Sequence, residues 1–352
     1  MAAQKYMHGV QLLAHGDLDQ LVWNEKIPVP VAGRGQALIK VLAAGVNNTD
    51  INTRLGWYAK DVTTSTDTTP TGDIADGGWG GALPFPLVQG GDLCGKIVGL
   101  GPDVANVELG MRVICANVQP EPTPDNPRKY AVIGSEYDGA FAQFCVVPAK
   151  HLYDVSAAPL SDVEMAAIPC AYGTAMGLLR RAGVGKNDHV LITGASGGVG
   201  MACVQLTKIL AARVTGIASP PKQNAVLAAG ADHVISRNDV PRPNGFDVVI
   251  DVVGGPAWGD LIQALAPGGR YAVSGAIAGP MVTGDLRTVY LNDLSLLGST
   301  FQPAQGFAAL VDLVNQGRVR PLVSKTYPLR DIRLAQEDFQ SKTHPGKLVL
   351  IP

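Results

Sequence analysis

Two patterns of apolar residues divide the chain. Up to about Val155, short apolar runs alternate with glycine and proline. Four of these runs are predicted as strands, at residues 36–41, 95–100, 112–116 and 141–147. Many short strands at this spacing are typical of a β-barrel or a sandwich. Polar insertions interrupt them at Lys60–Ala82 and around Gln119–Pro124.

Beyond about Ser156 the pattern changes to strands that alternate with helices. Apolar runs predict strands at residues 189–193, 213–218, 246–251 and 270–274. Residues 199–212 place Val199, Cys203, Leu206 and Leu210 on one face of a helix. This alternation indicates a parallel, doubly wound sheet. A helix at 305–316 and a strand at 347–351 follow.

Composition excludes several classes of protein. The 352 residues suggest two domains. The 28 Lys+Arg against 30 Asp+Glu give no reason to expect nucleic-acid or membrane partners. No apolar run is long enough to span a bilayer, and no leader opens the chain. The scattered cysteines argue against a disulfide framework, so we expect a cytoplasmic protein; they are Cys94, Cys115, Cys145, Cys170 and Cys203.

The strongest local motif is a glycine-rich turn between the predicted strand at 189–193 and the helix that follows it. Glycine allows the tight turn and lets backbone amides approach a pyrophosphate, while the helix N-terminus adds partial positive charge. Strand before and helix after make this turn a dinucleotide-binding motif. We assign to it Gly194, Ser196, Gly197, Gly198, Val199 and Gly200.

The next predicted strand selects the nucleotide. Sheets that bind NAD carry a carboxylate at this strand's end, which accepts a hydrogen bond from the ribose 2′-hydroxyl. Here the strand runs into Ser219 and then Lys222 with no acidic residue, and Arg237 follows the third strand. A hydroxyl and two cations suit a 2′-phosphate. We therefore expect NADPH rather than NADH.

Several further motifs, taken together, give the chain a family resemblance. It resembles the medium-chain dehydrogenase/reductase superfamily over essentially its full length; the matching segments are Gly45–Asp50, Gly90–Asp92, Gly110–Val113, Asp138–Ala142, Gly194–Gly200 and Gly346–Leu350. The resemblance implies an α/β protein with a GroES-like β-barrel domain at 1–156 and 302–352 and a Rossmann domain at 157–301. It places the active site between these domains.

The residues at the family's zinc-ligand positions differ from those of its zinc-dependent members. Such members have Cys where Asn47 stands and His-Glu where Gly91-Asp92 stand, and only Cys170 is retained. One thiolate cannot form a catalytic zinc site, which needs three protein ligands. We therefore predict no zinc and interpret Cys170 as a small buried residue.

The remaining pattern resembles the zinc-free quinone oxidoreductase branch, which passes hydride from NADPH to a quinone or enone. Without a metal, negative charge that develops on the substrate oxygen needs hydrogen-bond donors. We assign this role to the Tyr58 hydroxyl and the Asn47 amide, although Tyr58 as simple packing stays an alternative. Trp57 and Asn48 are assigned to substrate binding.

The resemblance also implies further cofactor contacts in the Rossmann domain, and its last strand commonly forms a homodimer in relatives. These contacts are Thr174, Val253, Gly275, Ala276, Ile277, Thr300 and Phe301.

Three functions stay open. The first is NADPH-dependent reduction of quinones or activated C=C bonds. The second is NADP-dependent alcohol or carbonyl oxidoreduction, and the third is NADPH binding without catalysis. In the first two, the partner is a small-molecule quinone, enone or carbonyl compound, and Lys60–Ala82 is interpreted as a lid over it.

Overall fold

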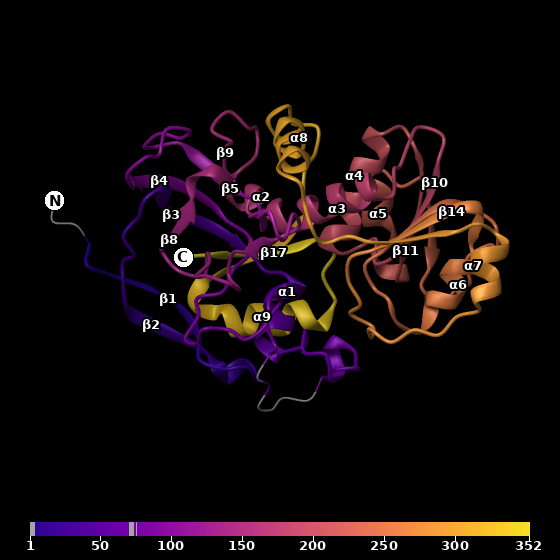
Figure 1. The fold of residues 1–352 in the computed structure, drawn as a ribbon, viewed down its shortest axis with the longest axis horizontal. Helices are drawn as coiled ribbons and strands as arrows, with labels where there is room; N and C mark the ends of the chain where they lie inside the picture. The colour runs from indigo at the N-terminus through magenta and orange to yellow at the C-terminus, as the bar shows by residue number, and fades with distance from the viewer. Residues whose placement is uncertain (1–3, 70–73, 75) are drawn as a thin grey trace. The chain divides into compact units, whose positions relative to one another are not determined.

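The chain folds into two units (Figure 1). The computed structural model describes residues 4–69, 74 and 76–352. The first unit comprises Met1–Val62, Pro70–Cys170 and Pro303–Pro352, and the second comprises Thr63–Thr69 and Ala171–Gln302. Part of the predicted lid, residues 70–73 and 75, lies outside the described residues.

The first unit contains a seven-stranded, mainly antiparallel sheet and two two-stranded sheets. Its strands are β1 (Tyr6–Leu12), β2 (Leu21–Pro28), β3 (Gln36–Gly45), β4 (Cys94–Leu100), β5 (Arg112–Cys115), β6 (Val118–Pro120), β7 (Tyr130–Val132), β8 (Phe144–Pro148), β9 (Leu152–Asp154), β16 (Val323–Pro328) and β17 (Lys347–Ile351). Its helices are α1 (Asn48–Leu55), α2 (Asp162–Met165), α8 (Ala304–Asn315) and α9 (Ile332–Ser341).

Seven of these strands form one sheet, in the order β16-β17-β3-β4-β5-β9, with β8 also paired to β3. Within β3, Ala37, Ile39 and Val41 point into the core. This alternation is the pattern that predicted the strand. The β17 strand, near the C-terminus, pairs with β3, so both ends of the chain contribute to the predicted GroES-like barrel, which is confirmed.

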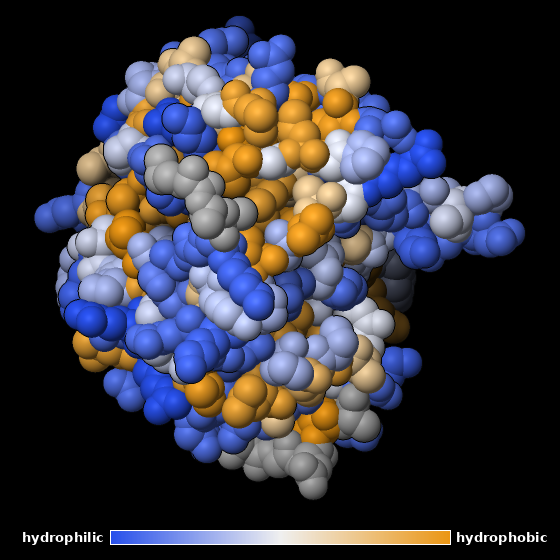
Figure 2. All heavy atoms as spheres, turned by 90° about the vertical axis from the view of Figure 1, so that its left-hand side faces the viewer, coloured by the Kyte–Doolittle hydropathy of each residue, from blue (hydrophilic) through white to orange (hydrophobic). Residues whose placement is uncertain are grey.

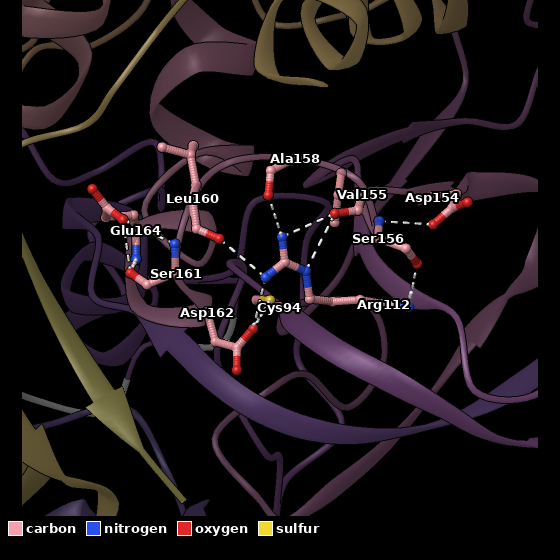
Figure 3. Close-up of polar contacts among 10 residues, drawn as sticks. All are labelled: Cys94, Arg112, Asp154, Val155, Ser156, Ala158, Leu160, Ser161, Asp162 and Glu164. Carbon is pink, nitrogen blue, oxygen red and sulfur yellow. Dashed lines mark hydrogen bonds and ion pairs between the residues drawn. The ribbon is translucent and has the colours of Figure 1, made fainter. Parts of the chain in front are cut away.

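Arg112 fixes the segment that leads out of the barrel (Figure 3). Its guanidinium donates to the carbonyls of Val155 at 2.9 Å, Ala158 at 3.0 Å and Leu160 at 3.0 Å. It also forms a 3.2 Å ion pair with Asp162. These contacts explain why the first unit continues past residue 156, where we expected it to end, and includes α2.

The second unit is a parallel sheet with helices. Its elements are α3 (Pro169–Arg181), β10 (His189–Ile192), α4 (Gly198–Ile209), β11 (Arg213–Ala218), α5 (Gln223–Ala228), β12 (His233–Ser236), β13 (Phe246–Asp251), α6 (Trp258–Gln263), β14 (Leu265–Val273), α7 (Leu286–Leu291) and β15 (Ser295–Gly298). The strand order is β12-β11-β10-β13-β14-β15, with every pair parallel. This is the doubly wound Rossmann order, which confirms the predicted fold class.

In the part of the chain that the structure describes, no helix is both long and apolar enough to cross a bilayer. On the side shown in Figure 2, apolar residues form separate patches among hydrophilic ones. All five cysteines are free and buried.

Candidate active site

The predicted cofactor residues of the second unit gather at one edge of its sheet. The glycine-rich turn follows β10, Ser219 follows β11, and Arg237 follows β12. Val253, Gly275–Ile277 and Thr300–Phe301 come after the next three strands. Because the strands are parallel, all these loops leave from their carboxyl ends, where such sheets bind nucleotides. Thr174 differs, since it lies within helix α3.

The glycine-rich turn has the backbone conformation that lets a pyrophosphate come close to its N–H groups. Gly194 adopts a left-handed φ of 55°, and the Gly197 N–H donates to its carbonyl at 2.9 Å. A Cβ on Gly200 would overlap the backbone of Gly194, so only glycine lets the helix begin this close to the strand. Helix α4 begins at Gly198, which directs its free N–H groups toward the turn.

Ser219 and Arg237 are brought to neighbouring strand ends. In the β11–β12 pair, Ala218 lies opposite Ser236, so the residue after each strand occupies the same edge. Lys222 lies two residues beyond Pro220 in a short 3-10 turn. Arg237 is exposed and has no ion pair with any residue that the structure describes. The predicted hydroxyl and cations therefore follow adjacent strands.

A buried carboxylate that the sequence did not identify holds two of these loops. Asp251, at the end of β13, accepts hydrogen bonds from the hydroxyls of Thr193 and Tyr271, both at 2.6 Å. It also accepts from the backbone N–H groups of Val253 at 2.9 Å and Gly254 at 3.1 Å. Asp251 therefore connects the phosphate turn with the loop after β13, and an aspartate at the end of an apolar strand was the available signal.

In the first unit, Asn47 lies at the start of α1 within a buried polar cluster. Its Nδ2 donates to Asp92 Oδ2 at 2.9 Å, with a longer 3.4 Å contact to the Gly45 carbonyl. Its Oδ1 accepts from the ammonium of Lys347. The Asn47 amide is therefore engaged on both sides, and a substrate oxygen would have to replace one of these partners.

Lys347 and Asp92 are the charged centre of this cluster. Their side chains are 4% and 0% exposed, and their Nζ–Oδ2 distance is 2.8 Å. Lys347 also donates to the Val46 carbonyl at 2.9 Å. The other carboxylate oxygen of Asp92 accepts the Cys170 N–H at 2.6 Å, which fixes the first turn of α3. Lys347 was seen in the sequence only as part of a family motif, because its partners lie far away along the chain.

These residues do not fit a catalytic zinc ion. A lysine ammonium, itself a cation, contacts Asn47 and Asp92, and burial raises the pKa of the Cys170 thiol to about 12, which disfavours the thiolate that zinc requires. A side chain on Gly91 would overlap the Asn117 amide. In the described part of the chain, no group of three or more His, Cys, Asp or Glu residues is arranged to hold a metal.

Asp50 lies beside this cluster and accepts the Asn47 N–H at 2.8 Å. Burial raises the pKa of Asp50 to about 7, although hydrogen bonds from the backbone of Asn47 and Gly91 oppose the rise. Its role is therefore to hold the first turn of α1, with a charge that changes near neutral pH.

Tyr58 follows α1, and the side-chain amides of Asn48 and Asn52 connect it to that helix. Burial raises the pKa of Tyr58 above its ordinary value, while a side-chain hydrogen bond from Asn52 opposes this. Asn48 donates to Asn52 Oδ1 at 3.1 Å, one helical turn away. The phenol therefore stays protonated at neutral pH. Asn52 was not predicted, although its spacing from Asn48 places both on one helix face.

Comparison with known proteins agrees with this architecture. Residues 33–157 match the alcohol dehydrogenase GroES-like domain family, and residues 229–350 match the zinc-binding dehydrogenase family. The chain therefore belongs to the medium-chain dehydrogenase/reductase superfamily and is an NAD(P)H-dependent oxidoreductase.

Individual relatives span nearly the whole chain. A solved structure from Sinorhizobium meliloti 1021, described provisionally as an alcohol dehydrogenase, is 38% identical with a TM-score of 0.89, covering 100% of this chain and 98% of that one. Acryloyl-coenzyme A reductase from Metallosphaera sedula is 28% identical and covers 91% of this chain and 93% of its own. Quinone oxidoreductase from Mus musculus is 27% identical, with 99% and 98% covered.

Proposed function

We propose that the protein is an NADPH-dependent reductase of quinones or activated C=C bonds that works without zinc. The observation that carries the proposal is the buried Lys347–Asp92 ion pair: Asp92 stands at one of the family's zinc-ligand positions, and Asn47, at another, contacts both charges. Because these positions hold an amide and a carboxylate that is paired with an ammonium, stabilisation of a substrate oxygen falls to other donors in the first unit. The names of the acryloyl-coenzyme A reductase and the quinone oxidoreductase support this substrate class.

Tyr58 is the proposed donor. NADPH, when bound, would supply a hydride to the β-carbon of the conjugated substrate, and the carbonyl oxygen would gain negative charge. A protonated phenol stabilises this charge by a hydrogen bond and can pass on its proton. The side-chain hydrogen bond between Asn52 and Tyr58 connects the phenol to α1. Asn47 then acts by fixing the start of α1 rather than as a free donor.

NADPH is proposed over NADH because the end of β11 offers Ser219 and Lys222 instead of a carboxylate, with Arg237 at the neighbouring strand end. A charge-assisted hydrogen bond to the 2′-phosphate would be made only with NADPH.

The proposed assembly rests on exposed apolar residues at one edge of the sheet in the second unit. We propose a cytoplasmic homodimer formed along the edge strand β15, where Leu296 is 44% exposed, next to α7 with Leu286 and Leu291 at 74% and 70%. Apolar residues this exposed beside a sheet edge suit pairing with a second copy. A solution mass equal to the 36.7 kDa chain in light scattering would refute the dimer.

Alcohol oxidation is the second candidate, because the Sinorhizobium relative carries that description. Turnover separates the two: we expect NADPH consumption with 1,4-benzoquinone and 3-buten-2-one, and no reduction of NADP⁺ by primary or secondary alcohols. In the Tyr58→Phe variant, kcat for the enone should fall by about 10²-fold, the usual contribution of one proton donor, with cofactor affinity unchanged. Alcohol-dependent turnover would favour the second candidate, and cofactor binding without any turnover would favour a non-catalytic protein.

A further inference from the structure

A glycine-rich turn within the polar insertion presents one tryptophan. The Gly78 N–H donates to the Gly81 carbonyl at 3.0 Å, and the reverse contact is 3.4 Å, so Trp79 and Gly80 form the tip of a tight turn. A side chain on Gly77 would overlap the backbone of Gly56, the residue that caps α1. Glycine at this position therefore lets the turn lie directly against the end of the helix.

The close approach brings Trp79 onto Tyr58. Their rings are stacked, with centroids 5.5 Å apart and planes 10° from parallel. Trp57 also contacts Tyr58, edge to face, with ring centroids 5.5 Å apart and planes tilted by 80°. All three side chains are half-buried, so each keeps part of its surface accessible.

A second contact holds the turn in place. The carboxylate of Glu136 accepts a hydrogen bond from the Gly80 backbone, and its Oε2 also accepts the Val132 N–H at 2.6 Å. The turn is therefore tied both to α1 and to β7. Trp79 is consequently a positioned side chain rather than the tip of a loose loop.

We propose that Trp79 determines substrate specificity: with Tyr58 and Trp57 it binds the planar, electron-poor ring of a quinone or cyclic conjugated ketone. The proposal rests on the proposed function, in which Tyr58 is the proton donor. Indole and phenol rings are electron-rich, and their faces attract flat conjugated partners beyond the area that they bury. A small acyclic enone offers no such ring, so its binding gains little from Trp79.

Equilibrium dialysis tests the assignment without turnover. The probe is menadione, in the presence of saturating NADP⁺, which cannot donate a hydride. We expect Trp79→Leu, which keeps an apolar side chain but removes the ring, to weaken menadione binding by about threefold to tenfold, as for loss of one aromatic pair. Trp79→Phe should recover at least half of the lost affinity on a logarithmic scale.

Two controls separate specificity from general damage. Trp23, on β2, is also half-buried and packs against His8 at 4.9 Å, so Trp23→Leu should leave menadione binding unchanged. The KM for 3-buten-2-one should change less than twofold in Trp79→Leu. A Trp79→Leu variant that binds menadione as tightly as the parent, or a Phe variant no better than Leu, overturns the assignment.

The same dialysis distinguishes this proposal from the proposed function. A parent protein that binds menadione in a Trp79-dependent way but reduces neither menadione nor 3-buten-2-one with NADPH refutes the reductase and supports the Trp79 assignment. A parent protein that reduces enones but does not bind menadione refutes the Trp79 assignment alone.

Discussion

Replacing Lys347 by Met tests whether the buried ammonium is an essential part of the first unit. Methionine has a similar length and no charge, so the change removes three interactions and adds no bulk. Asp92 would then be left as a carboxylate with 0% exposure and only neutral donors, the Asn47 amide and the Cys170 N–H.

The expected cost follows from this burial. Removing one partner of a buried ion pair usually destabilises a protein by about 3–5 kcal/mol, because the remaining charge keeps its desolvation penalty. We therefore expect the free energy of unfolding to fall by this amount in Lys347→Met. The double variant Lys347→Met/Asp92→Asn removes both charges, so it should be more stable than Lys347→Met alone.

The assay is urea denaturation at pH 7, followed by circular dichroism. Lys325→Met is a matched control, because Lys325 forms a 2.7 Å ion pair with Asp338 but is 45% exposed. An exposed pair contributes about 0–1 kcal/mol, so this control should barely change the midpoint. If the two single variants lose equal stability, or if the double variant is no more stable than Lys347→Met, the buried pair does not have the importance assigned to it.

Two further variants probe single groups. Burial raises the pKa of Asp50 to about 7, so the folded protein binds this proton more tightly than the unfolded chain does; the resulting stability is complete below about pH 4 and is lost as the pH rises through 7. Between pH 4 and pH 8 the free energy of unfolding should thus fall by up to about 4 kcal/mol more in the parent protein than in Asp50→Asn. An equal pH dependence in both proteins would contradict the assignment. Lys222→Ala should weaken NADPH by about 1–3 kcal/mol while NADH binding stays constant, as measured by calorimetry, and an unchanged preference would exclude Lys222 from 2′-phosphate binding.

Elements with regular apolar runs could be predicted from the sequence, and irregular ends could not. Strands β11 and β13 match their predicted ranges, residues 213–218 and 246–251, because each is a short apolar run bounded by turn residues. Strand β14 begins at Leu265, five residues before its predicted start, because a register shift against β13 accommodates the Pro-Gly-Gly segment that reads as a turn. Helix α4 ends at Ile209, short of the predicted residue 212, where Ala211 adopts a left-handed φ of 59°.

In the candidate site, too, local motifs could be predicted from the sequence, whereas contacts between distant residues could not. The phosphate turn is a local motif, so the seven residues Gly194–Gly200 and their flanking strand and helix were enough to predict it. Trp79 could have been noticed among its four glycines, but only the folded turn shows that it lies on Tyr58. The roles of Lys347 and Asp251 depend on side chains brought together by the sheet, which no spacing along the chain reveals.

The residues at the family's zinc-ligand positions depend on one another. An Asn47→Cys change alone would remove the amide that contacts both Lys347 and Asp92, and would place a thiol next to an ammonium. A histidine at Gly91 would need the Asn117 amide to move. A zinc ion would in addition have to tolerate the buried ammonium of Lys347, whose positive charge repels a divalent cation. Building a metal site here would therefore need several simultaneous changes, whereas Asn47, Asp92 and Lys347 now satisfy one another's hydrogen bonds. This mutual dependence is the physical reason to expect metal-independent chemistry from this chain.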